Sequence, residues 1–137
     1  MNRSLIKTRV QKFLSETRNN NLPVTPQKLA IFEYIASTDK HPMAEDILKN
    51  VRKKFPNLSD GTIYKNLKKF KSLHLIHEID APDGKRYDAN IEPHDHLINL
   101  DTGEIHDIKQ TSQFKLPKNF KNLTLYRASV TYYTRSK

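Results

Sequence analysis

The sequence contains no cysteine and no long apolar run, and both absences limit what the chain can be. Without cysteine it has no disulfide, no thiolate zinc site and no thiol nucleophile. No apolar stretch reaches about 18 residues, the length of a membrane-spanning helix. The N-terminus alternates basic and apolar residues instead of forming the apolar core of a signal peptide. We therefore expect a cytoplasmic protein with no membrane partner.

Length and charge limit the domain organisation and suggest a kind of partner. A chain of 137 residues with 36% hydrophobic content predicts one domain, or two small ones with modest cores. Residues 1–90 hold 17 Lys and Arg against 10 Asp and Glu, whereas residues 91–137 hold 7 against 5. This N-terminal excess fits a polyanion such as nucleic acid, because neutralised phosphates release counterions. On charge alone, a Lys-rich solvated surface is an equal alternative.

The first half of the chain carries four helical patterns followed by two short strands. Thr25 and Pro26 form the N-cap and first-position pair that begins a helix, and Pro56 closes the third pattern. The helical patterns run from Leu5 to Leu14, from Pro26 to between Ser37 and Lys40, from Ala44 to Phe55, and from Ser59 to Leu73. Strands are predicted at 75–80 and 85–89 around a turn in which Gly84 takes a positive φ. Helices followed by a hairpin predict a winged helix-turn-helix.

The fourth pattern has one apolar stripe and one basic face. A buried stripe is expected at Ile63, Leu67, Phe70 and Leu73, so the opposite side is free to meet DNA. We expect Tyr64 to contact a base and Lys68 and Arg86 to contact phosphates. The full predicted DNA-binding set is Ser59, Thr62, Tyr64, Lys65, Lys68 and Arg86.

The remaining residues predict a second, smaller unit beyond a hinge at 90–93. Strands are expected at 94–100 and 104–108, and one long strand at 123–134. About 45 residues are marginal as an isolated fold, so we expect homodimerisation through this part. The predicted fold class is α+β, with a winged-helix DNA-binding domain at 1–90 and a small α/β metal-sensing dimerisation domain at 91–137.

A metal site is indicated by DANIEPHDHLINLDTGEIHD, which runs from residue 88 to residue 107. His94 and His96 are two apart on a predicted strand and therefore point to the same face. Asp88 and Asp107 flank them as single carboxylates. A nitrogen and oxygen set without thiolate suits Mn, Fe, Co, Ni, Cu or Zn, whereas Mg and Ca prefer all-oxygen shells.

Several segments together resemble the ferric uptake regulator family of metal-sensing dimeric bacterial repressors. The segments, in order, are VTPQKLAIFEYI, HPMAEDI, FPNLSDGTIYKNLKKF, GKRYDA and HDHLINLDTGEIHDI, within residues 20–108. The resemblance implies a regulatory site for Fe(II) or Mn(II), with Zn(II) possible, at His41, Asp88, His94, His96 and Asp107. Aspartate at 107 resembles the peroxide-sensing branch, in which hydrogen peroxide oxidises the iron-bound histidines matching His41 and His94 and the repressor leaves DNA.

The chain also departs from the family pattern. Asn99 and Thr102 replace the first of two CxxC pairs and the second is absent, so no structural zinc bound by four cysteines is expected. Pro117 argues against the long dimerisation helix of the family, and Pro23 replaces a basic residue that often contacts the minor groove. Asp95 is expected at the surface, with a second ion site as the lesser alternative.

These observations predict a repressor that binds a palindromic DNA operator as a homodimer and is not an enzyme. The same-family alternative is an iron, manganese or zinc homeostasis regulator without peroxide sensing. A small metal-dependent hydrolase or oxygenase is a rival, because two His and one carboxylate also hold oxygenase iron. A DNA binder whose dimer no longer needs metal is another.

Overall fold

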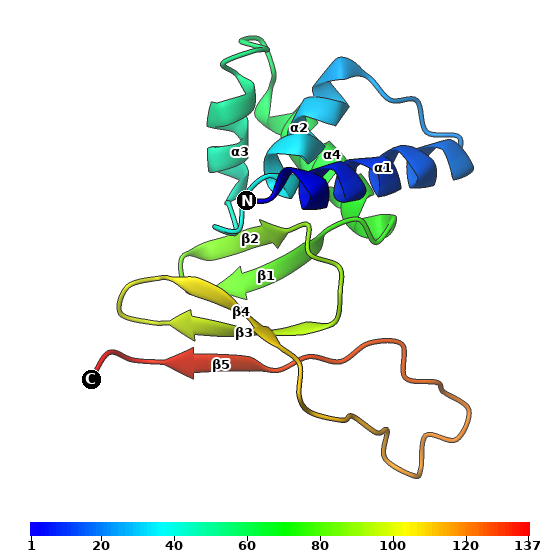
Figure 1. The fold of residues 1–137 in the computed structure, drawn as a ribbon, viewed down its shortest axis with the longest axis vertical. Coiled ribbons are helices and arrows are strands. Elements are labelled where there is room, and N and C mark those ends of the chain that lie inside the picture. The colour runs from blue at the N-terminus through cyan, green and yellow to red at the C-terminus, as the bar shows by residue number, and fades with distance from the viewer. The chain divides into compact units, whose positions relative to one another are not determined.

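The computed structural model describes residues 1–137, which divide into two compact units, Met1–Ile91 and Glu92–Lys137. The boundary predicted from the sequence lies one residue earlier, after residue 90. Four helices and five strands occupy different parts of the chain, so the α+β class is confirmed (Figure 1). None of the helices is both long and apolar enough to cross a membrane.

Unit 1 begins with four helices whose starts follow their capping residues. The helices are α1 (Arg3–Asn19), α2 (Pro26–Ala36), α3 (Ala44–Val51) and α4 (Asp60–Ser72). The Thr25 hydroxyl accepts from the Lys28 N–H, and the Ser59 hydroxyl accepts from the Thr62 N–H, as N-caps do. The third helix ends four residues before the predicted Phe55. The Lys53 and Lys54 N–H groups there bond to carbonyls three residues back, which tightens and ends the helix.

Three aromatic rings from three helices form the centre of the unit 1 core. Phe13 and Phe32 stack with ring centroids 4.5 Å apart, and Phe70 meets them edge-on at 5.3 and 5.8 Å. All three side chains are fully buried. The predicted stripe of α4 is confirmed for Ile63, Leu67 and Phe70, whereas Leu73 is the C-cap and only partly buried.

A two-stranded hairpin completes unit 1 and supplies the wing. Strand β1 (His77–Ala81) pairs antiparallel with β2 (Gly84–Asp88), and Ala81 lies opposite Gly84. The turn is therefore Pro82-Asp83, and Gly84 has the positive φ, 129°, that its position predicted. Helices followed by a paired hairpin give the expected winged helix-turn-helix.

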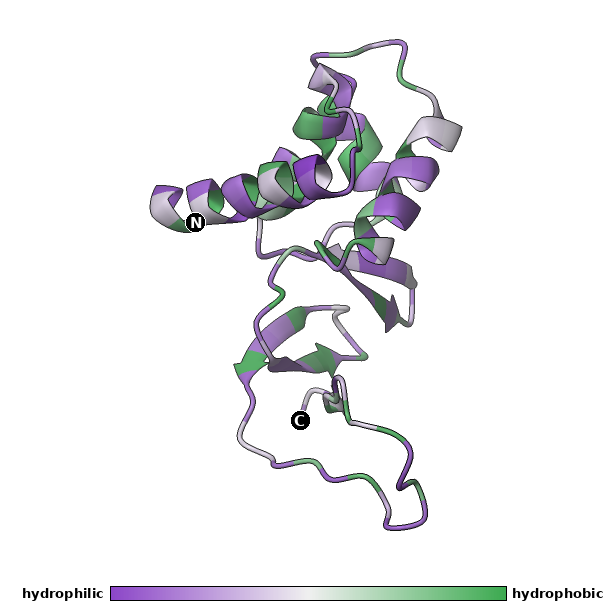
Figure 2. Cartoon of the chain, turned by 90° about the vertical axis from the view of Figure 1, so that its right-hand side faces the viewer, coloured by the Kyte–Doolittle hydropathy of each residue, from purple (hydrophilic) through white to green (hydrophobic).

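Unit 2 is a three-stranded sheet without a helix, whereas an α/β unit was expected. Strand β3 (His94–Asn99) lies in the centre, antiparallel to β4 (Ile105–Lys109) and parallel to β5 (Thr131–Thr134). Residues 110–130 connect β4 to β5 with no helix or strand. Hydrophobic residues are interspersed among hydrophilic ones along this connection, without a continuous apolar segment (Figure 2).

The long final strand predicted at 123–134 is wrong except for its last four residues. A strand needs a neighbour, and β3 pairs with β5 only from His96–Thr131 to Asn99–Thr134. Residues 123–130 are not part of a strand, although the Val130 carbonyl accepts from the His96 N–H, and Leu123 and Tyr126 are exposed. Their alternating pattern is therefore not matched by a sheet.

Candidate functional site

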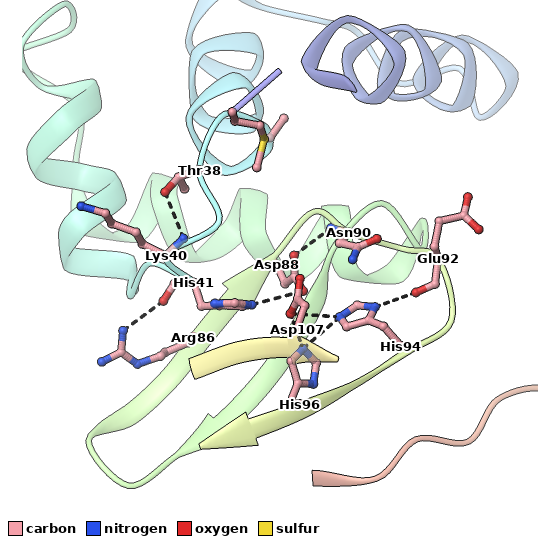
Figure 3. Close-up of polar contacts among 12 residues, drawn as sticks. Thr38, Lys40, His41, Arg86, Asp88, Asn90, Glu92, His94, His96 and Asp107 are labelled. Carbon is pink, nitrogen blue, oxygen red and sulfur yellow. Dashed lines mark hydrogen bonds and ion pairs between the residues drawn. The ribbon is translucent and has the colours of Figure 1, made fainter. Parts of the chain in front are cut away.

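The three predicted metal ligands of unit 2 converge on adjacent strands. His94 and His96 lie on one face of β3, and Asp107 on β4 is the register partner of His96. The two Nε2 atoms are 3.0 Å apart, and Asp107 Oδ1 is 3.4 Å from His94 Nε2 and 3.2 Å from His96 Nε2 (Figure 3). Both histidines are buried, while the carboxylate is partly exposed. The sequence spacing thus produces a real cluster of donor atoms.

The tautomer of His94 suits a metal ligand. Its Nδ1 lies 2.6 Å from the Glu92 carbonyl oxygen, which can only accept, so Nδ1 carries a proton. The Nε2 atom of the neutral ring then offers its lone pair to the cluster. A carbonyl behind a histidine is the usual way in which proteins orient an imidazole toward a metal. This support from Glu92 was not predicted from the sequence.

The donor spacing in unit 2 fits a single transition-metal ion. Ligands about 2.1 Å from an ion lie about 3.0 to 3.4 Å apart at octahedral to tetrahedral angles. The three separations within the cluster fall in this range. Two neutral imidazoles and one carboxylate also suit Mn, Fe or Zn. His94, His96 and Asp107 are therefore the unit 2 residues that can hold the ion.

The two predicted ligands of unit 1 also lie together. His41 Nε2 is 3.5 Å from Asp88 Oδ2, and both side chains are buried (Figure 3). The other oxygen of Asp88 accepts from the Asn90 N–H at 2.8 Å. His41 has a φ of 52°, a left-handed conformation that is uncommon outside glycine and that often marks functional positions.

Arg86 has contacts that differ from those of an open phosphate-binding residue. Its guanidinium meets the Asp83 carboxylate and the His41 carbonyl, and the side chain is 17% exposed. Arg86 is among the DNA contacts predicted from the sequence, as a phosphate partner. The pairing with His41 crosses 45 residues of sequence, so no local pattern indicated it.

The outward face of α4 presents the predicted DNA-reading residues. Tyr64 is 51% exposed, and Lys65 and Lys68 are exposed beside it. The hydroxyls of Ser59 and Thr62 are 2.9 Å apart and help to cap the helix. DNA contact by these residues stays a prediction. Ser59 and Thr62 also have a structural role at the N-terminus of α4.

Asp95 is buried and not at the surface as expected. It is 2% exposed, and its Oδ1 accepts from the Val130 N–H at 2.8 Å and from Gln110 Nε2 at 3.1 Å. The Val130 N–H, together with Gln110, lowers the pKa of the Asp95 carboxyl below its ordinary value. Asp95 therefore fastens the chain just before β5 to β3. Asp95 lies between His94 and His96 on β3, so the sequence alone places it on the opposite face of the strand.

Comparison with known proteins gives one consistent family. The model of the ferric uptake regulator family matches residues 19–133. The peroxide-responsive repressor PerR of Staphylococcus epidermidis is 35% identical over 99 residues, which are 72% of this chain and 66% of that protein. PerR of Staphylococcus aureus is 30% identical over 120 residues, 87% of this chain and 81% of that protein.

Solved structures give the same fold. The Helicobacter pylori ferric uptake regulator Fur superposes with a TM-score of 0.73 at 21% identity, covering 96% of this chain and 91% of that one. At this identity the likeness concerns the fold alone.

Proposed function

Because the chain belongs to the ferric uptake regulator family, we propose that it is a metal-dependent DNA-binding repressor that senses hydrogen peroxide. The observation that carries the proposal is the set of donor atoms of His94, His96 and Asp107, whose spacing fits one ion. The identity to two PerR proteins adds peroxide as the signal. The proposed ion is Fe(II) or Mn(II), with Zn(II) as a further candidate.

The proposed mechanism uses ligands from both units. His41 and Asp88 belong to unit 1, and His94, His96 and Asp107 belong to unit 2. If all five residues bound one ion, the ion would join the units in one fixed arrangement. Such binding stabilises the joined arrangement by the difference in metal affinity between the two states. In a homodimer this sets the separation of the two α4 helices, which must match the half-sites of a palindromic operator.

Peroxide sensing is assigned to two of the histidines. Fe(II) held at this site would supply the redox chemistry by which one oxygen atom of hydrogen peroxide is added to an imidazole and the other leaves as water, whereas Mn(II) would not. His41 and His94 are the proposed sites of oxidation. An oxidised imidazole is a poorer ligand, so the joined arrangement is lost and DNA is released. The proposed DNA contacts are made by Tyr64, Lys65 and Lys68.

The alternative within the family is a metal-homeostasis regulator that does not sense peroxide. The same nitrogen and oxygen donors bind iron, manganese or zinc reversibly. The fold likeness to the Helicobacter pylori Fur protein is compatible with this alternative. The two functions differ only in what happens to the histidines after metal binding.

The test measures binding of the apo, Mn-loaded and Fe-loaded protein to an AT-rich palindromic DNA, with and without hydrogen peroxide. We expect both metals to promote binding and peroxide to abolish it only for the Fe form. Mass spectrometry should then find one added oxygen on peptides containing His41 or His94. Retained binding and unmodified histidines would favour the homeostasis regulator.

A matched pair of variants checks the ligand set. His96→Ala should lose metal-promoted DNA binding, because it removes a central donor of the cluster. His106→Ala is the control, since His106 is exposed on β4 and contacts Glu104 instead of the cluster. Equal behaviour of the two variants would contradict the proposed metal site.

A further inference from the structure

The wing hairpin and the loop that carries His41 are held together at three neighbouring positions. The Arg86 Nη1 donates to the His41 carbonyl at 3.1 Å (Figure 3). The Tyr87 N–H donates to the Pro42 carbonyl at 3.0 Å. A Cβ on Gly84 would lie 3.0 Å from the Met43 Cε, so the wing turn packs directly on Met43. Each residue of the loop 41–43 therefore contacts β2.

Among these three contacts, only the one made by Arg86 comes from a side chain that also bonds to the wing turn. Its Nε donates to Asp83 Oδ1 at 3.3 Å and its Nη2 to Asp83 Oδ2 at 2.5 Å. This fork is the bidentate geometry that arginine forms with a carboxylate. The hydrogen bond from Arg86 lowers the pKa of Asp83, so the pair stays charged near neutral pH. The guanidinium thus spans from the turn to the His41 carbonyl.

We propose that Arg86 is a positioning residue that holds His41 in its metal-binding conformation and connects the DNA-binding wing to the metal site. The proposal rests on the proposed function, because it takes His41 as a metal ligand. Residues with left-handed φ persist where surrounding contacts fix them. The bond to the His41 carbonyl fixes the peptide that follows His41 and so restrains the backbone from which the imidazole projects. A shift of the wing on DNA is then transmitted to His41 through the same guanidinium.

The competing role for Arg86 is a phosphate contact, and the two roles predict different measurements. A phosphate contact leaves metal affinity unchanged without DNA and adds to the salt dependence of DNA binding. A positioning residue acts on metal affinity without DNA and leaves the salt dependence unchanged. Partners that orient metal ligands typically change metal affinity by about 10- to 100-fold when they are mutated.

The experiment compares Mn(II) affinity, by competition with a chelating dye, for the full-length wild type, Arg86→Lys and Lys85→Gln in the absence of DNA. Arg86→Lys keeps the positive charge but loses the fork that reaches both Asp83 and His41. Lys85→Gln is the matched control. Lys85 is the preceding residue of the wing, and its ammonium pairs with Glu78 and Asp80. Circular dichroism verifies that each variant is folded.

We expect Arg86→Lys to weaken Mn(II) binding by at least about tenfold and Lys85→Gln to leave it unchanged. The charge-removing variant Arg86→Gln, measured at saturating Mn(II), should have the same slope of log DNA affinity against log salt as the wild type. Unchanged Mn(II) affinity would overturn the proposal, and a slope that is also lower by about one would assign Arg86 to a phosphate.

A second variant keeps the test informative if Arg86→Lys fails to fold. Asp83→Asn retains Arg86 but removes the charged half of the fork, so we expect weaker Mn(II) binding in the same direction. If Asp83→Asn instead improves DNA binding without changing Mn(II) affinity, the freed guanidinium is a phosphate contact and the proposal is wrong. If the wild type binds no Mn(II), Fe(II) or Zn(II), the proposed function itself fails, and the positioning role fails with it.

Discussion

The aromatic cluster of unit 1 is the residue-scale feature with the clearest energetic consequence. The cluster joins α1, α2 and α4 through Phe13, Phe32 and Phe70. Contacts among the three rings therefore hold together helices that are separated in the sequence. Stacked and edge-on pairs of this kind add to the free energy gained by burying the rings. The N-terminal helix therefore depends on Phe13 for its place in the unit.

Phe13→Ala should lower the free energy of unfolding of unit 1 by about 3 to 5 kcal/mol, because a fully buried ring is replaced by a cavity. Urea unfolding followed by helical circular dichroism measures the change. Leu5→Ala on the same helix is the control, since Leu5 is exposed and the expected change is within about 0.5 kcal/mol. A loss below about 1 kcal/mol for Phe13→Ala would contradict this packing.

At the same scale, sequence spacing identified donors but not the groups that hold them. His94 and His96 follow from a two-residue period, and the cluster with Asp107 needs only two adjacent strands. Arg86 and the Glu92 carbonyl depend on side-chain direction and on loop geometry, which no short pattern encodes. Asp95 was predictable in part. The sequence indicated the strand face on which it lies but not its hydrogen bond to Val130, 35 residues away.

The β1–β2 hairpin carries an ion cluster whose contribution depends on pH. Lys85 Nζ lies 2.7 Å from Glu78 Oε1, and Lys71 Nζ of α4 lies 3.2 Å from Glu78 Oε2. The hydrogen bond from Lys85 lowers the pKa of Glu78 below its ordinary 4.5 against the effect of burial, and Lys71 acts in the same direction. Glu78 therefore ties the hairpin to α4 while it is ionised.

Glu78→Gln should lower the melting temperature of the protein at neutral pH and have little effect in acid. Because the folded-state pKa of Glu78 is lowered, its stabilisation is fully present above the unfolded-state pKa and is lost as pH falls through the folded-state value. Salt screening limits the contribution to under about 1 kcal/mol. Thermal melts from about pH 3 to pH 7 measure it, with Glu33→Gln on α2 as the control. A pH-independent difference would show that the charge of Glu78 is irrelevant.

Helices were easier to predict than strands in this chain for a physical reason. The starts of α2 and α4 follow from Thr25 and Ser59, because a cap acts on its own helix within a few residues. Strand β5 instead depends on the length of β3, to which it is paired across a long stretch of sequence. Alternation in residues 123–130 therefore predicted strand residues that the pairing of β3 with Thr131–Thr134 does not include.

At the scale of the whole molecule, unit 2 needs a further source of stability. It has three short strands, no helix and no cysteine with which to bind a structural zinc. Leu123, Tyr126 and Tyr133 are exposed large hydrophobic residues in this unit. The outer edges of β4 and β5 have no neighbouring strand in the sheet order β4-β3-β5. Exposed apolar side chains and open edges are features that self-association covers.

We expect the protein to be a dimer at micromolar concentration even in the presence of a strong chelator, because its association does not depend on a cysteine-bound zinc. Sedimentation velocity with and without chelator and with added Mn(II) measures this. Tyr133→Glu should raise the dimer dissociation constant by at least about tenfold, since it places a charge on the outer strand β5. Tyr64→Glu is the control, because it introduces the same charge on α4 of unit 1, and the dimer should survive. A monomer in all metal states would contradict both the dimer and the operator geometry that depends on it.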